Sequence, residues 1–214
     1  MRVLVLLGFA LLASVVRAAE TDSLAVPANR IAPDDPAWEE LAGGLREQKA
    51  ITAPFTENRW FPFKKTPTVL KGESRVAAGR GLSLHYIFPE EVTTIIDAHG
   101  LLTRTAQGDT AAAPDPQAAA ANNALLHVLA LDLRALAETF ELYGQRTATD
   151  WKLALVPKDA SLRRTLGQIS IEGEKAAVRR IELRRSAVQR VEILIGPPRT
   201  EAAFSSDDLH RYFR

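Results

Sequence analysis

The chain has 214 residues, a formal net charge of +1, 46% hydrophobic residues and no cysteine. This length suits one domain with a substantial core, and the near-neutral charge argues against a dedicated nucleic-acid binder. Without cysteine, disulfides, thiolate catalysis and cysteine-based metal sites are excluded, so stability has to come from the apolar core.

The N-terminus is typical of a cleaved secretory signal. Arg2 precedes an apolar run that ends at Val16, and Val16-Arg17-Ala18 fits the small-x-small cleavage rule. The run is too short for a spanning helix, although an uncleaved anchor remains an alternative. We expect a signal peptide over 1–18, an extended segment over 19–33 and one domain over 34–214, soluble in a bacterial periplasm.

The first predicted helix lies in "DDPAWEELAGGLREQ", where Asp35 is the expected N-cap. From Thr52 onward, apolar residues recur at every second position, which predicts strands. They lie in "TAPFTENRWFPF", in "TVLKGESRVAAGRG" with a bulge at Gly72, in "LSLHYIFPEEVTTIIDAHG" and in "LLTRT". No helix interrupts them, so we expect antiparallel neighbours.

A helical block from about 119 to 142 follows an Ala- and Pro-rich loop. Its leucines keep helical spacing, and Asp132 can cap a second helix, so a break is expected near Leu131. Asp159 can cap a short helix between the next two strands, which lie in "WKLALVP" and "LGQISIEG". "AVRRIELRR" and "VQRVEILIG" continue the alternation, and the tail "SSDDLHRYFR" can form one helical turn.

These elements predict a mainly β, α+β fold built on a large antiparallel meander. A sheet of this length curls, and its concave apolar face has to be covered by the helices. The apolar strands have two interpretations. They are plain core, or they form the partly filled wall of a cavity for an apolar ligand.

Catalytic motifs are scarce. The sequence has no GxSxG, Walker or GxGxxG motif, and its four histidines form no HExxH or close ligand pair. Asp97 and His99, two residues apart, are the best candidates for an acid/base or metal pair, and a hairpin end facing water is the simpler interpretation. We therefore expect no enzyme activity, no metal and no cofactor.

Paired arginines mark the second half of the chain, at 163–164, 179–180 and 184–185, with Arg190 beyond them. Arg180, Glu182 and Arg184 share one strand face, and their mixed signs favour a solvated sheet face. The alternative is a basic surface for an acidic partner or for anionic lipid head groups.

The order of elements resembles the LolA-like family of periplasmic carriers of outer-membrane lipoproteins and lipids. The resemblance covers about 34–195 and is carried by "FTENR", by a strand that ends in an aromatic and then a proline (Tyr86, Pro89), and by the spacing W-x-L-x-L-x-P-x-D-x-x-L. It implies an unclosed antiparallel half-barrel with a helical lid. Tyr86 and Gly81 stand where the lipoprotein carriers usually have Trp and Pro, which makes the chain look closer to a divergent branch linked to aryl polyene lipid pathways.

The resemblance implies a carrier that binds acyl chains and passes them from an inner-membrane exporter to an outer-membrane acceptor lipoprotein. The cargo would be a lipoprotein, a glycolipid or a polyene lipid, and the carrier would be a monomer without nucleic-acid partners. Arg80, six residues before Tyr86, would help to hold the lid shut. The expected cavity lining is Trp60, Leu82, Leu84, Tyr86, Phe88, Ile95, Leu125, Leu129, Leu133, Trp151, Leu153, Ile169, Ile181 and Ile193.

Two rival functions stay open. An enzyme on the same fold would need Asp97, His99 or His85 to face into the cavity. A lipid- or protein-sensing module of the envelope would retain its ligand and would not need a cavity that opens.

Overall fold

The computed structural model describes residues 24–111 and 116–214, so the expected signal peptide lies outside the described residues. Within those ranges, twelve strands form one antiparallel sheet in the order β6-β5-β4-β3-β2-β1-β11-β10-β9-β8-β7, with β12 pairing β1. The strands are β1 Ala50–Trp60, β2 Thr68–Ala77, β3 Gly81–Phe88, β4 Val92–Asp97, β5 Gly100–Thr105, β6 Gly108–Ala111, β7 Phe140–Arg146, β8 Asp150–Pro157, β9 Gln168–Glu174, β10 Ala177–Arg184, β11 Arg190–Ile195 and β12 Arg199–Glu201.

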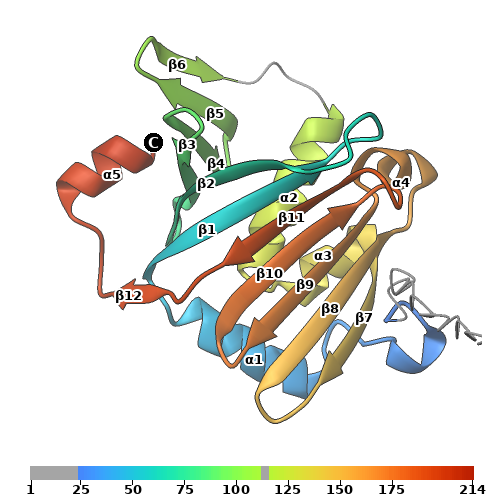
Figure 1. Ribbon diagram of the computed structural model, residues 1–214. Coiled ribbons are helices and arrows are strands. Elements are labelled where there is room, and N and C mark those ends of the chain that lie inside the picture. The colour runs from blue at the N-terminus through green and yellow to red at the C-terminus, as the bar shows by residue number, and fades with distance from the viewer. Residues whose placement is uncertain (1–23, 112–115) are drawn as a thin grey trace, which may run out of the picture.

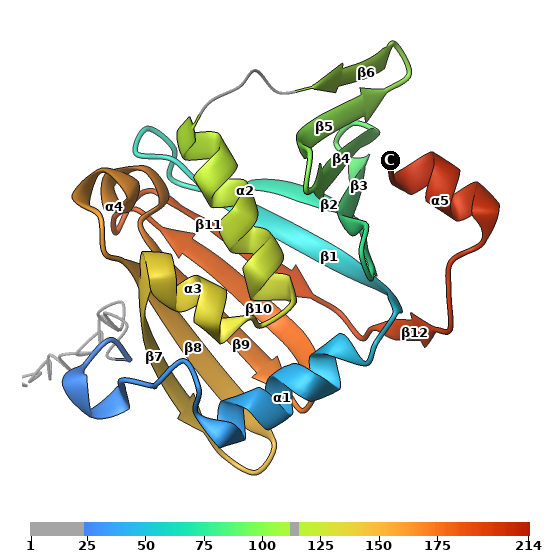
Figure 2. The ribbon, with the colours of Figure 1, turned by 180° about the vertical axis from the view of Figure 1, so that it is seen from behind.

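The sheet curves strongly without closing, and three helices cover its concave face (Figures 1 and 2). Figure 2 looks into this face, with α2 crossing the middle of the sheet and α1 and α3 beside it. The expected mainly β, unclosed half-barrel covered by helices is confirmed. The helices are a 3₁₀ turn at Pro27–Asn29, α1 Pro36–Arg46, α2 Pro116–Leu129, α3 Leu133–Thr139, α4 Ala160–Leu166 and α5 Ser206–Tyr212.

Local signals set the helix boundaries. Asp35, Asp132 and Asp159 accept hydrogen bonds from backbone N–H groups at the starts of α1, α3 and α4, as their positions predicted. Leu131 adopts a φ of 45° between α2 and α3, which confirms the expected break. The β2–β3 register shifts between Lys71 and Gly72, where a bulge was predicted.

The main core lies between the concave face of β7–β10 and the helices α1 and α3. Trp38 of α1 meets Trp151 of β8 edge to face, with ring centroids 6.4 Å apart. Each indole packs on a glycine, because a Cβ at Gly144 would lie 2.2 Å from Trp38 and one at Gly173 would lie 2.1 Å from Trp151. This half of the sheet is therefore filled by side chains.

The convex face of β8–β11 carries a ladder of alternating charges. Arg180 binds Glu192 and Glu172 at 2.7 and 3.1 Å and also pairs with Glu182, which in turn pairs with Arg184. The expected sharing of one face by these arginines and Glu182 is therefore confirmed, and the ladder neutralises that part of the arginine set.

The C-terminal segment packs on the convex face of the other half-sheet. After β12 pairs with the start of β1, α5 places Tyr212 and Phe213 against Ala77. Arg75 lies 3.6 Å from the centroid of the Tyr212 ring, and Arg214 binds the buried carboxylate of Asp97 at 2.6 and 2.7 Å. The tail is thus a fixed layer of the fold.

Candidate functional site: an apolar cavity under helix α2

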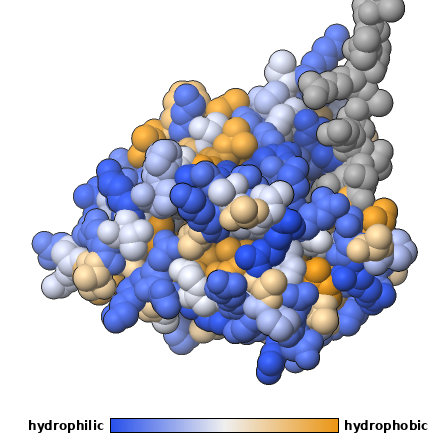
Figure 3. Space-filling model, turned by 90° about the horizontal axis from the view of Figure 1, so that it is seen from below, coloured by the Kyte–Doolittle hydropathy of each residue, from blue (hydrophilic) through white to orange (hydrophobic). Residues whose placement is uncertain are grey.

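The concave face of β1–β3, β10 and β11 is only partly filled and encloses a cavity of about 580 Å³ beneath α2. This volume is within the roughly 300–1,000 Å³ of pockets that hold small organic ligands. Viewed from the end where β1 begins, apolar side chains gather in the middle of the surface within a polar frame (Figure 3). The cavity is therefore a place where an apolar ligand can be removed from water.

The sheet side of the cavity follows strict alternation. Leu82 and Leu84 point inward from β3, and the buried Ser83 between them points to the convex face. Ile181 and Ile193, which face each other across β10 and β11, continue the same wall. The inner side chains of β1 and β2 complete it with Ile51, Ala53, Phe55, Ser74 and Val76.

Helix α2 covers the cavity with one face and contacts the main core with another. Leu125, Leu126 and Leu129 are partly buried and line the cavity. Ala124 and Val128, on the other face, are buried in the main core. The helix therefore has an anchored face and a leucine face over the hollow.

The mouth of the cavity carries a few polar groups. Arg46 pairs with Glu39, and the Gln48 amide donates to the carbonyl of Ala176 at 2.6 Å. Arg80, in the β2–β3 turn, donates to the carbonyl oxygen of Arg214 at 2.9 Å. Among the described residues that line the cavity, none is acidic.

A second cavity of about 320 Å³ lies further along the same concave face, beside α4. On β1, Phe55 lines the larger cavity and Glu57 the smaller one. On β11, Ile193 lines the larger cavity and Val191 the smaller one. Since Glu57 pairs with Ile193 in the sheet, the two cavities lie end to end with Glu57 at their junction.

The junction is a buried polar cluster. Glu57 is 4% exposed and accepts hydrogen bonds from the Tyr86 hydroxyl at 2.7 Å and from Arg59 Nε at 2.5 Å. Burial, together with the Glu57 carboxylate, raises the pKa of Tyr86, so its hydroxyl remains a donor at any physiological pH. This cluster bounds the apolar surface of the larger cavity at one end.

The structure brings six of the predicted lining residues together around the larger cavity, with Arg80 at its edge. They are Leu82, Leu84, Leu125, Leu129, Ile181 and Ile193. Tyr86 lies beyond the end of the cavity in the polar junction. Arg80 has no hydrogen bond to α2 among the described contacts, since its partner is Arg214.

Four predicted lining residues belong to the main core instead. Leu133, Trp151, Leu153 and Ile169 are 6% exposed or less and are enclosed by the core under α1 and α3. Trp151, Leu153 and Ile169 share the concave face with the cavity residues, but helices fill the space above them, and Leu133 belongs to one of these helices, α3. Strand alternation cannot distinguish a wall that a helix covers from a wall that lines a void.

Three further predicted residues are placed elsewhere, which corrects those expectations. Trp60 lies away from the larger cavity, in the lining of the smaller one, where Arg190 stacks 4.0 Å from its ring centroid. Ile95 is buried on the convex face between Ser83 and Leu102. Phe88 is 53% exposed at the end of β3, past the bulge in the β2–β3 register.

These errors have a common physical cause. In β1, Glu57 and Arg59 continue the face of Phe55, while the large apolar Trp60 is one position out of phase with them. In β4 two isoleucines are adjacent, and Ile96, not Ile95, faces inward beside Leu82. If the alternation of a strand is assigned one residue out of phase, every side chain is placed on the wrong face of the sheet. The apolar residues Ala53 and Phe55, two positions apart, could have indicated which face of β1 points inward.

The candidate catalytic residues lie outside the cavity. Asp97 is bound by Arg214 and by the backbone N–H of His99, and it caps the β4–β5 turn. His85 is on the convex face, 3.0 Å from the Thr93 hydroxyl and packed on the Tyr212 ring. Within 24–111 and 116–214, no cluster of three metal-binding side chains occurs, and no helix has the length and apolarity to cross a bilayer.

The chain is similar to several solved structures. The chain is similar over 80% of its length to 96% of a LolA superfamily protein from Nitrosomonas europaea, at 7% identity and a TM-score of 0.43. A DUF1329 family protein from Desulfovibrio piger matches with 8% identity over 81% of this chain and 95% of its own, at a TM-score of 0.47. The MucA/MucB complex structure from Pseudomonas aeruginosa matches at 16% identity and a TM-score of 0.43, over 81% of this chain and 59% of that one.

The comparison with curated proteins gave no match. The family model described as "Outer membrane lipoprotein carrier protein LolA-like" matches residues 39–211, which include the sheet, the helices over it and most of α5. The chain therefore belongs to the LolA-like family of outer membrane lipoprotein carrier proteins.

Proposed function

We propose that this protein is a periplasmic carrier that holds the acyl chains of a lipid or lipidated protein in the cavity under α2. The observation that supports this most directly is the roughly 580 Å³ cavity, whose lining of leucine, isoleucine, valine and alanine contains no acidic residue among those described. The family assignment supports the same class of cargo.

The energetics favour acyl chains as the ligand. Each methylene group moved from water into an apolar site contributes about 0.8 kcal/mol. About ten buried methylene groups would supply about 8 kcal/mol before the entropic cost of binding is subtracted. Buried apolar area thus supplies affinity without requiring a specific polar contact.

Release requires that the cavity open. Helix α2 is anchored through Ala124 and Val128, while Leu125 and Leu129 cover the hollow, so movement of this helix would expose the bound chains. We propose that Arg80, which lies at the edge of the cavity, contributes to gating through the turn that it shares with the mouth. An inner-membrane exporter would load the carrier and an outer-membrane lipoprotein would accept the cargo.

The cargo class extends from lipoproteins to glycolipids and aryl polyene lipids. Tyr86 and Gly81 depart from the residues usual in lipoprotein carriers, which favours the lipid cargo. We propose that the chain acts as a soluble monomer after removal of residues 1–18.

Native mass spectrometry of the protein purified without detergent, with analysis of extracted lipids, tests cargo binding. Ile193 and Leu194 are neighbours on β11 that face the cavity and the convex surface respectively. We expect the wild-type protein to carry one acyl-bearing ligand in a stoichiometric complex. The Ile193→Asp variant should lose this ligand, and the Leu194→Asp variant should keep it. A folded wild-type protein that stays empty when offered envelope lipids would overturn the proposal.

Transfer between vesicles separates the carrier from a sensing module. A carrier moves a labelled lipid from donor to acceptor vesicles faster than spontaneous exchange, whereas a sensing module retains it. The enzyme alternative has no specific support, because Asp97 and His85 face away from the cavity.

A further inference from the structure

Three basic segments surround the smaller cavity, at the end of the sheet where β1 and β10 finish. Residues 58–67, 161–166 and 185–190 contain no aspartate or glutamate. Side chains or backbone from all three line that cavity. Their basic residues, here called the basic rim, are Arg59, Lys64, Lys65, Arg163, Arg164, Arg185 and Arg190.

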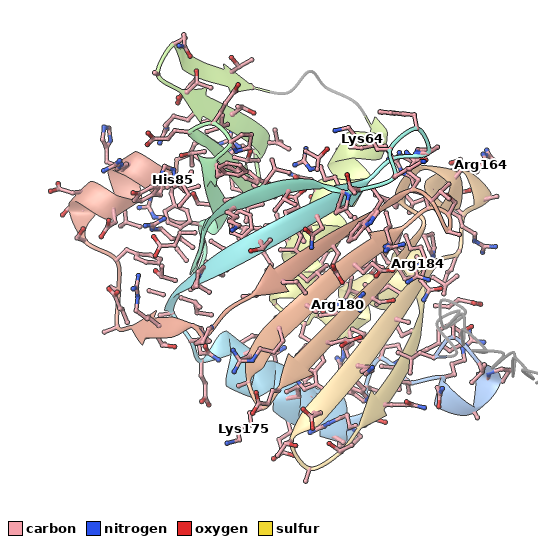
Figure 4. All side chains as sticks on the ribbon, viewed as in Figure 1. Lys64, His85, Arg164, Lys175, Arg180 and Arg184 are labelled. Carbon is pink, nitrogen blue, oxygen red and sulfur yellow. The ribbon has the colours of Figure 1, made fainter. Side chains whose placement is uncertain are left out.

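The basic rim is largely unneutralised. Among the described residues, the only ion pair within 4.0 Å that involves the rim joins Arg59 to the buried Glu57. Arg163 donates to the carbonyl of Pro157 and Lys64 to the hydroxyl of Thr68, and both partners are uncharged. Figure 4 shows Lys64 and Arg164 at the same end of the molecule, with Lys175 at the opposite end.

Exposed apolar side chains lie within this basic region. Phe63 is 80% exposed in the β1–β2 loop, and Val188 is 57% exposed in the β10–β11 turn. Phe63 stacks on Phe61 at 5.4 Å, and Phe61 lines the smaller cavity. Exposed apolar side chains that gather within a polar surface mark protein or membrane interaction sites.

We propose that the basic rim, Phe63 and Val188 dock the protein on an anionic membrane surface. Lysine and arginine bind anionic head groups, while an aromatic ring at a loop tip inserts at the interface of the bilayer. The apolar side chains lie on two separate turns, which suits insertion into a soft surface better than a flat contact with an acidic protein. This inference does not depend on whether the cavity under α2 holds lipid.

Flotation with vesicles of phosphatidylethanolamine alone, or mixed with phosphatidylglycerol, tests the proposal. We expect preferential binding to the anionic vesicles that weakens as salt is raised. At about 1 kcal/mol for each basic residue near an anionic surface, Lys64→Asn with Lys65→Asn should weaken binding at least about tenfold. Lys49, just before the start of β1, and Lys175, at the end opposite to Lys64 in Figure 4, are both exposed. Lys49→Asn with Lys175→Asn removes the same charge and should leave binding unchanged.

Two further variants test the apolar contribution. Phe63→Ser with Val188→Ser should reduce anionic vesicle binding, and Leu194→Ser on the convex face should not. Phe63→Trp should show a blue-shifted emission on anionic vesicles, and free glycerol phosphate should not produce that shift. Equal binding to both vesicle types, or no effect of the rim substitutions, overturns the proposal of docking on an anionic surface. Absence of binding to either vesicle type also overturns it and points to an acidic protein partner.

Discussion

At the scale of single residues, the buried carboxylate of Glu57 is the least expected feature of the concave face. It lies where the mainly apolar wall of the larger cavity ends, and its two hydrogen bonds come from Tyr86 and Arg59. Charged groups are retained in such places only when their hydrogen-bond partners are fixed. We infer that this cluster sets where the apolar lining of the larger cavity ends.

Removal of the Tyr86 hydroxyl should measure what the cluster contributes. Tyr86→Phe leaves one oxygen of the Glu57 carboxylate without its donor, which should lower the free energy of unfolding by about 1–3 kcal/mol. A lower denaturant concentration at the unfolding midpoint, with an unchanged slope of the unfolding free energy against denaturant concentration, would show this. An unchanged midpoint would mean that water replaces the hydroxyl and that the junction is open to solvent.

The raised pKa of Tyr86 has a consequence at high pH. The folded state holds this proton more tightly than the unfolded state, whose tyrosine has an ordinary pKa of 10.0. The contribution to stability is therefore complete below pH 10 and is lost as the pH rises above it. The wild type should lose stability above pH 10 more steeply than Tyr86→Phe in alkaline denaturation curves, and parallel curves would contradict this.

Two glycines give opposite expectations for the same substitution. A Cβ at Gly173 would lie 2.1 Å from the Trp151 ring, so Gly173→Ala should destabilise the fold by about 1–3 kcal/mol. Gly43, in α1, has nothing within 4 Å of its added Cβ, so Gly43→Ala should stabilise by about 0.5–1 kcal/mol. Thermal unfolding of both variants checks this pair, and equal shifts would contradict the packing described.

Side-chain orientation was the least predictable property of the sequence. Leu82 and Leu84 could be assigned inward because their neighbours are polar. The phase of β1 could not be read from its largest apolar residue. Trp60 is one position out of phase with Phe55 and stacks with Arg190, while Glu57 is stabilised on the concave face by Tyr86. Such tertiary partners lie far away in the sequence, so alternation alone does not reveal them.

At the scale of elements, boundaries were more predictable than positions. Asp35, Asp132 and Asp159 bind backbone N–H groups two or three residues away, so the caps are local and the sequence indicates them directly. The place of α5 was not predictable, because its partners, Arg75, His85 and Asp97, come from strands more than 100 residues earlier. The same is true of the space left beneath α2.

The contact between α5 and β3 should depend on pH. Burial lowers the pKa of His85 below its ordinary 6.5, Arg75 and Arg211 act in the same direction, and Glu91 and Glu73 oppose them. The unfolded state therefore binds the proton more readily, so stability is complete above pH 6.5 and falls as the pH drops below it.

His85→Asn keeps a polar group beside Thr93 and removes the titration. We expect the variant to lose less stability than the wild type between neutral and mildly acidic pH, together with slower hydrogen exchange in α5 under acid. If wild type and variant lose stability equally across this range, His85 does not control the contact.

At the scale of the whole molecule, the half-barrel divides into two parts with different tasks. Beside β7–β9, the concave face is filled by α1 and α3 and forms the stable core. Beside β1–β3, the same face keeps a cavity beneath α2, with the end of α1 also in its lining. Composition and strand order could predict this architecture, since a long antiparallel sheet with three covering helices has few compact arrangements.

The charged surface of the molecule is also divided. The ladder around Arg180 and Glu182 is neutralised internally, and α5 covers the β2–β4 region. The rim around the smaller cavity keeps its positive charge. Binding of acyl chains and contact with a membrane would therefore use two separate regions, at opposite ends of one concave groove.

The most direct test of the central proposal is photo-crosslinking with a lipid that carries a photoactivatable group at the end of its acyl chain. After irradiation, peptide mapping identifies the side chains that contact the chain end. The proposed function predicts labels on Leu84, Leu129 and Ile193, which line the cavity from β3, α2 and β11. Labels confined to Leu194, Val188 or other exposed residues, with none in the cavity, would contradict it.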